Sequence, residues 1–363
     1  VAYGTPAAVC ANEKSLTGQY LSGRKQIPLP ELPPKLSDDK TRATMVPALR
    51  HLELRGVREH NLKNVTLRLP LKRLVCITGV SGSGKSTLVE DVLHPALLKA
   101  TGKPTEAPGE FDQLVGAELI DDVVMVDQKP IGRTTRSNPA SYVGAFDAIR
   151  ELYAAEPAAR ARSYTAGTFS FNSGTGRCTA CNGNGFEHVE MQFLSDVYLR
   201  CGECDGRRYR AETLEIKREG ANGRRASIAD ALDLTVTEAL AFFKDVPAIT
   251  LRLQPLADVG LEYVKLGQPV PTLSGGEAQR LKLAGHLATA AADDKPSLRG
   301  KLFLFDEPTT GLHFEDVAKL LRSFRKLQKA GHSLLVGDYN LDVLRVADWI
   351  VDLGPEGGDA GGT

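Results

Sequence analysis

The chain lacks a net charge and lacks any long apolar run. Its 363 residues carry 45 Lys and Arg against 45 Asp and Glu, so composition alone does not point to a nucleic-acid partner. The stretch from residue 128 to residue 225 holds 15 basic against 11 acidic side chains, an excess that a solvated face explains as well as a DNA-binding face. No apolar run is long enough to cross a bilayer and no signal peptide is visible, so we expect a cytoplasmic protein without a membrane partner.

The remaining composition is that of an ordinary globular chain. Hydrophobic residues make up 42% and charged residues 25%, and the length predicts two or three domains. The opening stretch has little hydrophobic periodicity and includes Pro28–Pro34, whose sequence PLPELPP favours an extended, polyproline-like linker. We therefore expect residues 1–45 to be a tail or connector. Since the first residue is Val1 and not Met, we also expect the chain to be a piece of a longer polypeptide.

Residues 79–87, GVSGSGKST, form the motif around which the chain is organised. An apolar run at residues 74–78 precedes it and a helical pattern follows it, which is the order of strand, turn and helix that a phosphate-binding loop requires. Its glycines let successive N–H groups point at one anion, Lys85 would reach the β- and γ-phosphates of ATP, and Ser86 would hold Mg²⁺. A purely structural glycine turn is the alternative. The expected nucleotide contacts are Gly79, Ser81, Gly82, Ser83, Gly84, Lys85, Ser86 and Thr87.

Two further stretches end in side chains that suit the same chemistry. The buried strand predicted at residues 302–305 is followed by Asp306 and Glu307. We expect Asp306 to hold Mg²⁺ through water and Glu307 to polarise the water that attacks the γ-phosphate. Gln128 follows a predicted strand at residues 123–126 and could contact Mg²⁺ or the same water. The structural alternatives are a helix cap for the two carboxylates and an exposed polar cap for Gln128.

The stretch LSGGEAQR, from Leu273 to Arg280, opens a helical pattern that runs to about residue 292. Two glycines at a helix N-terminus expose backbone N–H groups and predict a second anion site. The residues that would form this site are Ser274, Gly275, Gly276 and Glu277.

Four of the six cysteines form two Cys-x-x-Cys pairs. The first pair is Cys178 and Cys181 and the second is Cys201 and Cys204, with glycines after each pair that permit tight turns. This spacing predicts a structural Zn²⁺ held by four thiolates with no open coordination position. A disulfide is disfavoured because the rest of the chain looks intracellular and linked to ATP. The intervening residues 186–199 could form a protruding hairpin.

Arginines cluster near the second cysteine pair and in a polar loop that precedes the module. They could meet DNA phosphates, or they could meet only solvent. A zinc knuckle that only braces the fold is the corresponding alternative for the whole module. The candidate DNA contacts are Arg133, Arg136, Arg200, Arg207 and Arg208, with Arg210 close by.

Together these motifs resemble the UvrA family, the ABC-type damage sensors of bacterial nucleotide excision repair, and specifically its second, C-terminal nucleotide-binding half. The resemblance covers the chain from about residue 50 to its end, and SLTGQYLSG at residues 15–23 resembles the end of the preceding half. Ordinary ABC domains lack the cysteine module, so this insertion is the specific mark. Further matching stretches are Arg58–Asn64, Arg136–Ala140, Phe169–Asn172, Asp306–His313 and Ala347–Pro355.

The resemblance implies an α/β fold with an ABC-type P-loop ATPase core, a helical signature subdomain and an inserted Cys₄ zinc module. Residues 1–45 would be the linker or tail of the preceding half. Residues 46–145 and 296–363 would form the two parts of the ATPase core. Residues 146–230 would form the zinc-binding, DNA-contacting module, and residues 231–295 the signature subdomain.

The resemblance also implies partners. The protein would bind ATP, Mg²⁺ and Zn²⁺, recognise damaged double-stranded DNA, and work as a homodimer with the first nucleotide-binding half of the same protein. In the family each ATP lies between the phosphate loop of one half and the LSGG sequence of another, so Ser274–Glu277 would serve a different ATP from the one at Lys85. The family contacts UvrB through its first half, so we expect no direct UvrB site on this chain.

The chain departs from the family pattern at two positions. Tyr339 stands where the family carries a histidine that touches the γ-phosphate, and a phenol titrates at about pH 10, so we expect slow hydrolysis. Lys129 replaces the usual polar residue after Gln128. These departures leave open a UvrA-like self-resistance protein that acts on drug-modified DNA. An ABC energy-coupling ATPase without a DNA role and a zinc scaffold with a vestigial ATP site are the other candidates, although intact Lys85, Asp306 and Glu307 argue against the scaffold.

Overall fold

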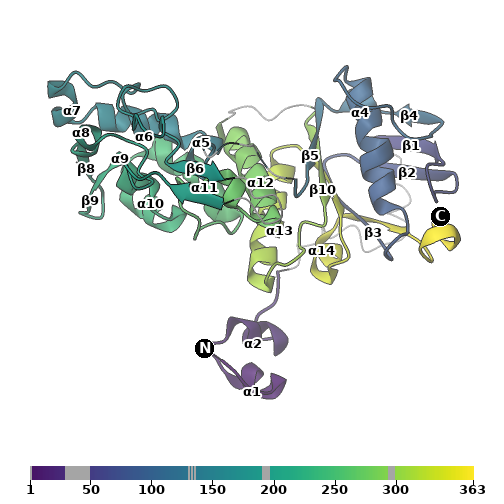
Figure 1. Ribbon diagram of the computed structural model, residues 1–363. Coiled ribbons are helices and arrows are strands. Elements are labelled where there is room, and N and C mark those ends of the chain that lie inside the picture. The colour runs from purple at the N-terminus through teal and green to yellow at the C-terminus, as the bar shows by residue number, and fades with distance from the viewer. Residues whose placement is uncertain are drawn as a thin grey trace. The chain divides into compact units, whose positions relative to one another are not determined.

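The structure is a computed structural model that describes residues 2–28, 50–129, 131, 134, 136–189, 197–292 and 299–363. The chain divides into two compact units (Figure 1). Unit 1 combines residues 1–127 with residues 295–363, and unit 2 is the continuous stretch 128–294. Within the described ranges no helix is long and apolar enough to span a membrane. The finer division into five parts stays a prediction.

Unit 1 is built on a parallel sheet of five strands in the order β12-β3-β11-β10-β5. Because all five strands run in the same direction, their carboxyl ends meet at one edge of the sheet, where α/β proteins bind ligands. The loops that leave this edge after β3, β10 and β11 carry the phosphate loop, Glu307 and Tyr339. The strands are β3 (Leu74–Gly79), β5 (Asp122–Val126), β10 (Lys301–Asp306), β11 (Ser333–Gly337) and β12 (Trp349–Leu353).

The sequence explains why these strands are central. They consist of nearly continuous β-branched, leucine and phenylalanine residues, the composition expected of strands that are covered on both faces. A second, antiparallel sheet in the order β2-β1-β4 packs its apolar residues into the same core. Its strands are β1 (His51–Val57), β2 (Val65–Pro70) and β4 (Gln113–Val115).

Helices complete unit 1. The helix after the phosphate loop begins as a π-helical segment, η2 (Thr87–Leu93), and continues as α4 (His94–Ala100). Helix α13 (Phe314–Lys329) buries one apolar face and exposes a charged face, as its 3.6-residue periodicity predicts. The remaining elements are α1 (Pro6–Ala11), α2 (Leu16–Leu21), η3 (Ala117–Leu119), α14 (Leu341–Val346) and η5 (Gly358–Ala360).

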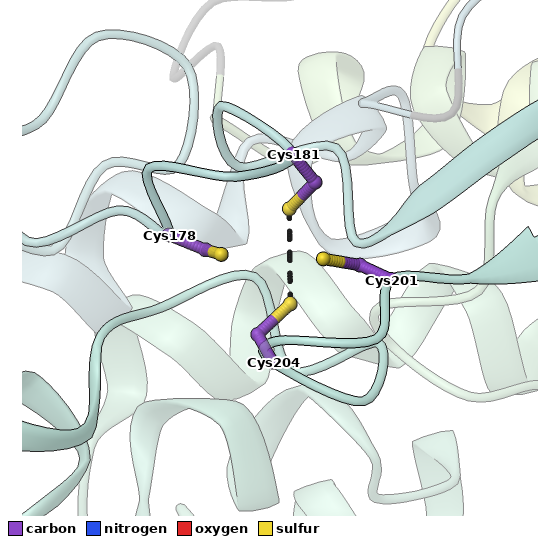
Figure 2. Close-up of side chains that lie close together, drawn as sticks. All are labelled: Cys178, Cys181, Cys201 and Cys204. Carbon is purple, nitrogen blue, oxygen red and sulfur yellow. Dashed lines mark hydrogen bonds between the residues drawn. The ribbon is translucent and has the colours of Figure 1, made fainter.

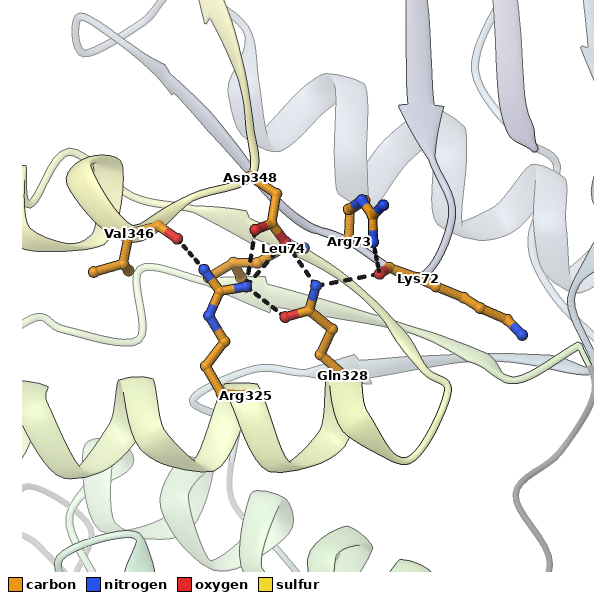
Figure 3. Close-up of polar contacts among 7 residues, drawn as sticks. All are labelled: Lys72, Arg73, Leu74, Arg325, Gln328, Val346 and Asp348. Atoms are coloured by element: carbon orange, nitrogen blue, oxygen red, sulfur yellow. Dashed lines mark hydrogen bonds and ion pairs between the residues drawn. The ribbon is translucent and has the colours of Figure 1, made fainter. Parts of the chain in front are cut away.

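A polar network fixes α13 to the starts of two strands (Figure 3). The Asp348 carboxylate accepts hydrogen bonds from the Leu74 N–H (2.8 Å), the Arg325 guanidinium (3.0 Å) and the Gln328 amide (2.7 Å). Gln328 also donates to the Lys72 carbonyl at 3.2 Å. Asp348 belongs to the stretch Ala347–Pro355, and these bonds show that its charge has a structural role, since it joins α13 to β3 and β12.

Unit 2 contains the cysteine module and a helical part. Strands β6 (Phe186–Val189) and β7 (Val197–Arg200) pair as the expected hairpin beside the cysteines, and α12 (Gly275–Ala292) is the expected helix after LSGG. A capping box formed by Thr235 and Glu238 opens α10 (Val236–Phe242). The other elements are α5 (Pro139–Tyr142), α6 (Ala145–Ala154), α7 (Pro157–Ala161), α8 (Ala211–Leu214), β8 (Lys217–Glu219), β9 (Arg225–Ser227), α9 (Ile228–Leu232), α11 (Pro247–Asp258) and η4 (Val270–Thr272).

Candidate functional site

The phosphate loop lines a cavity of about 620 Å³ in unit 1. At its start Gly79 has φ +139°, and a Cβ there would lie 2.1 Å from the Leu353 carbonyl oxygen, so the turn requires glycine. The Lys85 ammonium donates to the carbonyls of Gly79 (2.8 Å) and Val80 (3.0 Å). Of the contacts expected from the sequence, the cavity wall includes Gly79, Ser81, Gly82, Gly84, Lys85, Ser86 and Thr87, while Ser83 is fully buried.

The carboxylate pair lies where β10 ends. Glu307 lines the same cavity, and its backbone φ of +38° is a conformation that side chains other than glycine rarely adopt. The Glu307 N–H donates to the Gly337 carbonyl at 2.8 Å, and the Thr310 hydroxyl donates to its carboxylate at 3.3 Å. Burial, and then the neighbouring charge of Glu307, raises the pKa of Asp306. A cation beside this pair would offset both effects, because it favours ionised carboxylates.

Tyr339 completes the cavity wall at the end of β11. Its side chain is 59% exposed. The residue before it, Asp338, is buried and accepts hydrogen bonds from the N–H groups of Tyr339 (2.8 Å) and Asn340 (2.9 Å) and from the Thr309 hydroxyl (2.7 Å). Asp338 therefore ties the loop that carries Tyr339 to the loop that follows Glu307.

Sequence reasoning missed two residues of this site. Asp338 gave no local signal, because its partner Thr309 lies 29 residues away. Asn61 also lines the cavity, and it lies in the stretch Arg58–Asn64 that contributed to the resemblance but received no role.

The LSGG stretch begins α12 in unit 2. The side chains of Ser274 and Glu277 form a reciprocal capping box, with the Ser274 N–H donating to the Glu277 carboxylate at 2.8 Å. Burial alone would raise the pKa of Glu277, but hydrogen bonds from Ser274 and from the Tyr263 hydroxyl (2.7 Å) lower it. Apart from its chain neighbours and the backbone of its own helix, no described atom lies within 4 Å of a Cβ built on Gly276, whereas a Cβ on Gly275 would lie 3.4 Å from the Gln128 carbonyl oxygen.

The four paired cysteines converge in unit 2, as their spacing predicted (Figure 2). Their sulfur atoms all lie within 4.8 Å of one another, and all four residues are buried. The 3.7 Å between the Cys181 and Cys204 sulfurs matches the edge of about 3.8 Å that a tetrahedron with metal–sulfur bonds of about 2.3 Å requires, and excludes a disulfide between them.

Backbone donors surround these sulfurs. The Gly185 N–H points at the Cys181 sulfur (3.2 Å) and the Arg208 N–H at the Cys204 sulfur (3.3 Å). Burial raises the pKa of Cys181 and Cys204, whereas backbone N–H groups lower the pKa of Cys201. A bound cation would favour the thiolate at all four positions, so this donor set fits a zinc ion.

The expected arginines fall into different environments. Arg200 is exposed and lies 3.8 Å from Asp205, and Arg207 pairs with Asp230 at 2.5 Å. Arg136 donates to Asn184 at 2.8 Å, and Arg133 lies outside the described residues.

Arg208 requires a correction. It is only 3% exposed, and its guanidinium lies over the rings of Phe171 (4.9 Å) and Phe186 (5.9 Å). It also donates to the Gly267 carbonyl at 3.3 Å, and burial lowers its pKa. Arg208 therefore braces the cysteine module from inside and does not present its charge to a duplex.

Comparison with known proteins gives one consistent result, although no protein-family model matches the chain. The chain is 53% identical over 362 residues to UvrABC system protein A of Thermus thermophilus and 50% identical over 363 residues to that of Clostridium perfringens, covering all of this chain and 36% of each relative. The crystal structure of UvrA2 from Deinococcus radiodurans matches 99% of this chain and 40% of its own, with a TM-score of 0.81 and 43% identity. The chain thus spans a little over one third of the length of the curated relatives it matches. Sequence identity at about half of all positions and a shared fold along the chain together place it in the UvrA family.

Proposed function

We propose that this chain is the C-terminal nucleotide-binding half of a UvrA-type ATPase that recognises damaged DNA in nucleotide excision repair. The observation that carries this proposal is the meeting of the phosphate loop, Glu307 and Tyr339 around one cavity, in a chain that also gathers four cysteines into a metal-sized cluster. The relatives named UvrABC system protein A support the repair assignment.

In the proposed site the backbone of residues 79–87 cradles the phosphates of ATP, and Lys85 neutralises the charge that develops on the γ-phosphate. Ser86 and Asp306 would hold Mg²⁺, which neutralises phosphate charge when bound. Glu307 then accepts the proton of the attacking water. Its backbone bond to Gly337 fixes the start of the loop that carries this carboxylate.

The start of α12 would serve the ATP of another half. The space beside Gly276 is open, and α12 begins at Gly275, so the N-terminus of this helix can approach the triphosphate of an ATP bound to another half. Hydrolysis would therefore need a homodimer or the first nucleotide-binding half of the same protein, and the isolated chain should hydrolyse ATP poorly. We place no UvrB site on it.

The cysteine cluster would hold a structural Zn²⁺ that shapes the β6–β7 hairpin as a DNA-contacting arm. Arg200 at the end of β7 has an exposed side chain and is the candidate for phosphate contact, with Arg207 beside it. Recognition through DNA deformation, and not through base identity, agrees with the modest charge excess of this part of the chain.

Two measurements test the proposal together. Binding to damaged and undamaged duplexes is titrated against salt, with and without ATP, and ATP hydrolysis is measured with the first half present. A UvrA-type protein loses DNA affinity steeply with salt and loses hydrolysis in Lys85→Ala. An ABC energy-coupling ATPase would hydrolyse ATP without binding the duplex, which would refute the repair role. A preference for drug-modified over ultraviolet-damaged DNA would instead indicate the self-resistance class.

A further inference from the structure

Two stretches without an assigned role flank the phosphate loop in unit 1. One is the turn Arg58–Asn64 between β1 and β2. The other is the glycine-rich segment Gly354–Gly362 after β12. They are far apart in sequence, yet the Lys63 N–H donates to the Gly362 carbonyl at 2.8 Å, so the turn and the segment contact each other beside the loop.

Asn61 is the centre of this arrangement. Its side-chain amide donates to the carbonyl of Gly82 at 2.9 Å and to the carbonyl of Gly358 at 3.3 Å. The Gly358 N–H donates to the same Gly82 carbonyl at 3.0 Å. The Gly82 carbonyl is thus held by two donors, one from each flanking stretch.

Anchoring this carbonyl orients the loop. A peptide unit is planar, so fixing the Gly82 oxygen also fixes the direction of the Ser83 N–H, which donates to the Val80 carbonyl at 3.2 Å. These bonds set the peptide plane at the tip of the phosphate loop. A phosphate loop binds its anion through backbone N–H groups that all point toward the anion. A fixed orientation of the Gly82–Ser83 peptide therefore affects the affinity for the nucleotide.

The glycine-rich segment lies too close to the loop for any side chain at Gly357. Its φ of −95° suits every residue type, but a Cβ there would lie 2.4 Å from the Ser81 carbonyl oxygen. Glycine at this position is therefore required by contact with the phosphate loop and not by backbone conformation.

We propose that the turn Arg58–Asn64 and the segment Gly354–Gly362 clamp the phosphate loop in its binding shape, with Asn61 as the positioning residue that joins all three. This inference rests on the proposed function, because it concerns the ATP affinity of the Lys85 site. If the clamp exists, the ATP affinity of the Lys85 site depends on contacts that lie outside the phosphate loop.

The test measures ATP affinity and steady-state hydrolysis of the parent, Asn61→Ala, Asn61→Gln and Gly357→Ala, with the first half present for hydrolysis. Loss of the Asn61 bonds is expected to weaken ATP binding roughly tenfold and to raise KM with little change in kcat, since the groups that perform the chemistry are untouched. Asn61→Gln keeps the carboxamide and should recover part of the affinity. The matched control is Arg68→Ala, because this guanidinium lies on β2 outside the clamp, is largely exposed beside Glu53, and its loss should leave ATP affinity unchanged.

Fluorescence of Trp349, the only tryptophan of the chain, reports whether unit 1 of each variant is folded. If Asn61→Ala does not fold, Gly357→Ala carries the same test. ATP affinity within twofold of the parent in folded Asn61→Ala or Gly357→Ala overturns the clamp while leaving the proposed function intact. A parent that binds no ATP refutes the proposed function and the clamp with it.

Discussion

The Tyr20 hydroxyl donates a 2.9 Å hydrogen bond to the carboxylate of Glu315, although 295 positions separate the two residues. The Tyr20 ring also stacks on Phe314 with centroids 5.4 Å apart, and Lys25 forms an ion pair with Glu315. Helix α2 and the residues just after it are therefore docked on the first turn of α13, directly after the loop that follows Glu307. Burial and the bond to Glu315 raise the pKa of Tyr20 to about 12, so the phenol stays a donor throughout the physiological range.

Removing this hydroxyl should weaken the docking without abolishing it. Tyr20→Phe keeps the stacked ring and is expected to lower the free energy of unfolding of unit 1 by about 1 kcal/mol, the net value of one hydrogen bond. Tyr20→Ala removes the aromatic ring as well, so it should lower the free energy of unfolding further than Tyr20→Phe does. Urea unfolding followed by Trp349 fluorescence measures both. Equal losses in the two variants would show that the ring contributes nothing.

The same contact should depend on pH. The hydrogen bond from Lys25, followed by that from Tyr20, keeps the pKa of Glu315 below its ordinary value. The resulting stabilisation is present above the unfolded-state pKa of about 4.3 and is lost as the pH falls through the lower folded-state value. The difference in unfolding free energy between the parent and Glu315→Gln should therefore shrink between about pH 5 and pH 3. If the difference in unfolding free energy between the parent and Glu315→Gln stays constant over this pH range, the ionised Glu315 carboxylate does not stabilise the contact.

Metal removal should unfold the cysteine module. Freshly purified protein should contain one zinc ion per chain, and Cys201→Ser should lose it together with duplex affinity, because a structural zinc site supplies folding free energy. Elemental analysis and a zinc-release assay measure the metal, and circular dichroism follows the fold. Cys10→Ser is the matched control, since Cys10 lies in α1 of unit 1 and outside the cluster. Zinc-free parent protein that binds DNA normally would disprove the role of the metal.

Restoring a histidine at position 339 should accelerate hydrolysis. An imidazole can donate and accept a proton near pH 7, which suits a side chain that contacts the γ-phosphate during hydrolysis. Single-turnover hydrolysis, measured with the first half present, should be faster in Tyr339→His than in the parent. Tyr339→Phe, which keeps the ring and removes only the hydroxyl, should remain slow. If Tyr339→His shows no gain, Tyr339 does not limit turnover.

Several features of this protein were determined by sequence alone. The phosphate loop, the strand that ends in Asp306, the capped helix at Thr235 and the two cysteine pairs each follow from contacts within a few residues or from a fixed spacing, so the chain order reveals them. Cys76 is buried for the same reason, because it lies within the apolar strand β3.

Only the tertiary structure decided the rest. The burial of Arg208 over Phe171, the bond between Asp338 and Thr309, and the clamp of Asn61 on Gly82 join segments that no local period connects. A polar side chain looks the same in sequence whether it faces solvent or a distant carbonyl. Its role depends on which backbone groups the folded sheet and its loops bring within hydrogen-bonding distance, and that is a property of long-range packing.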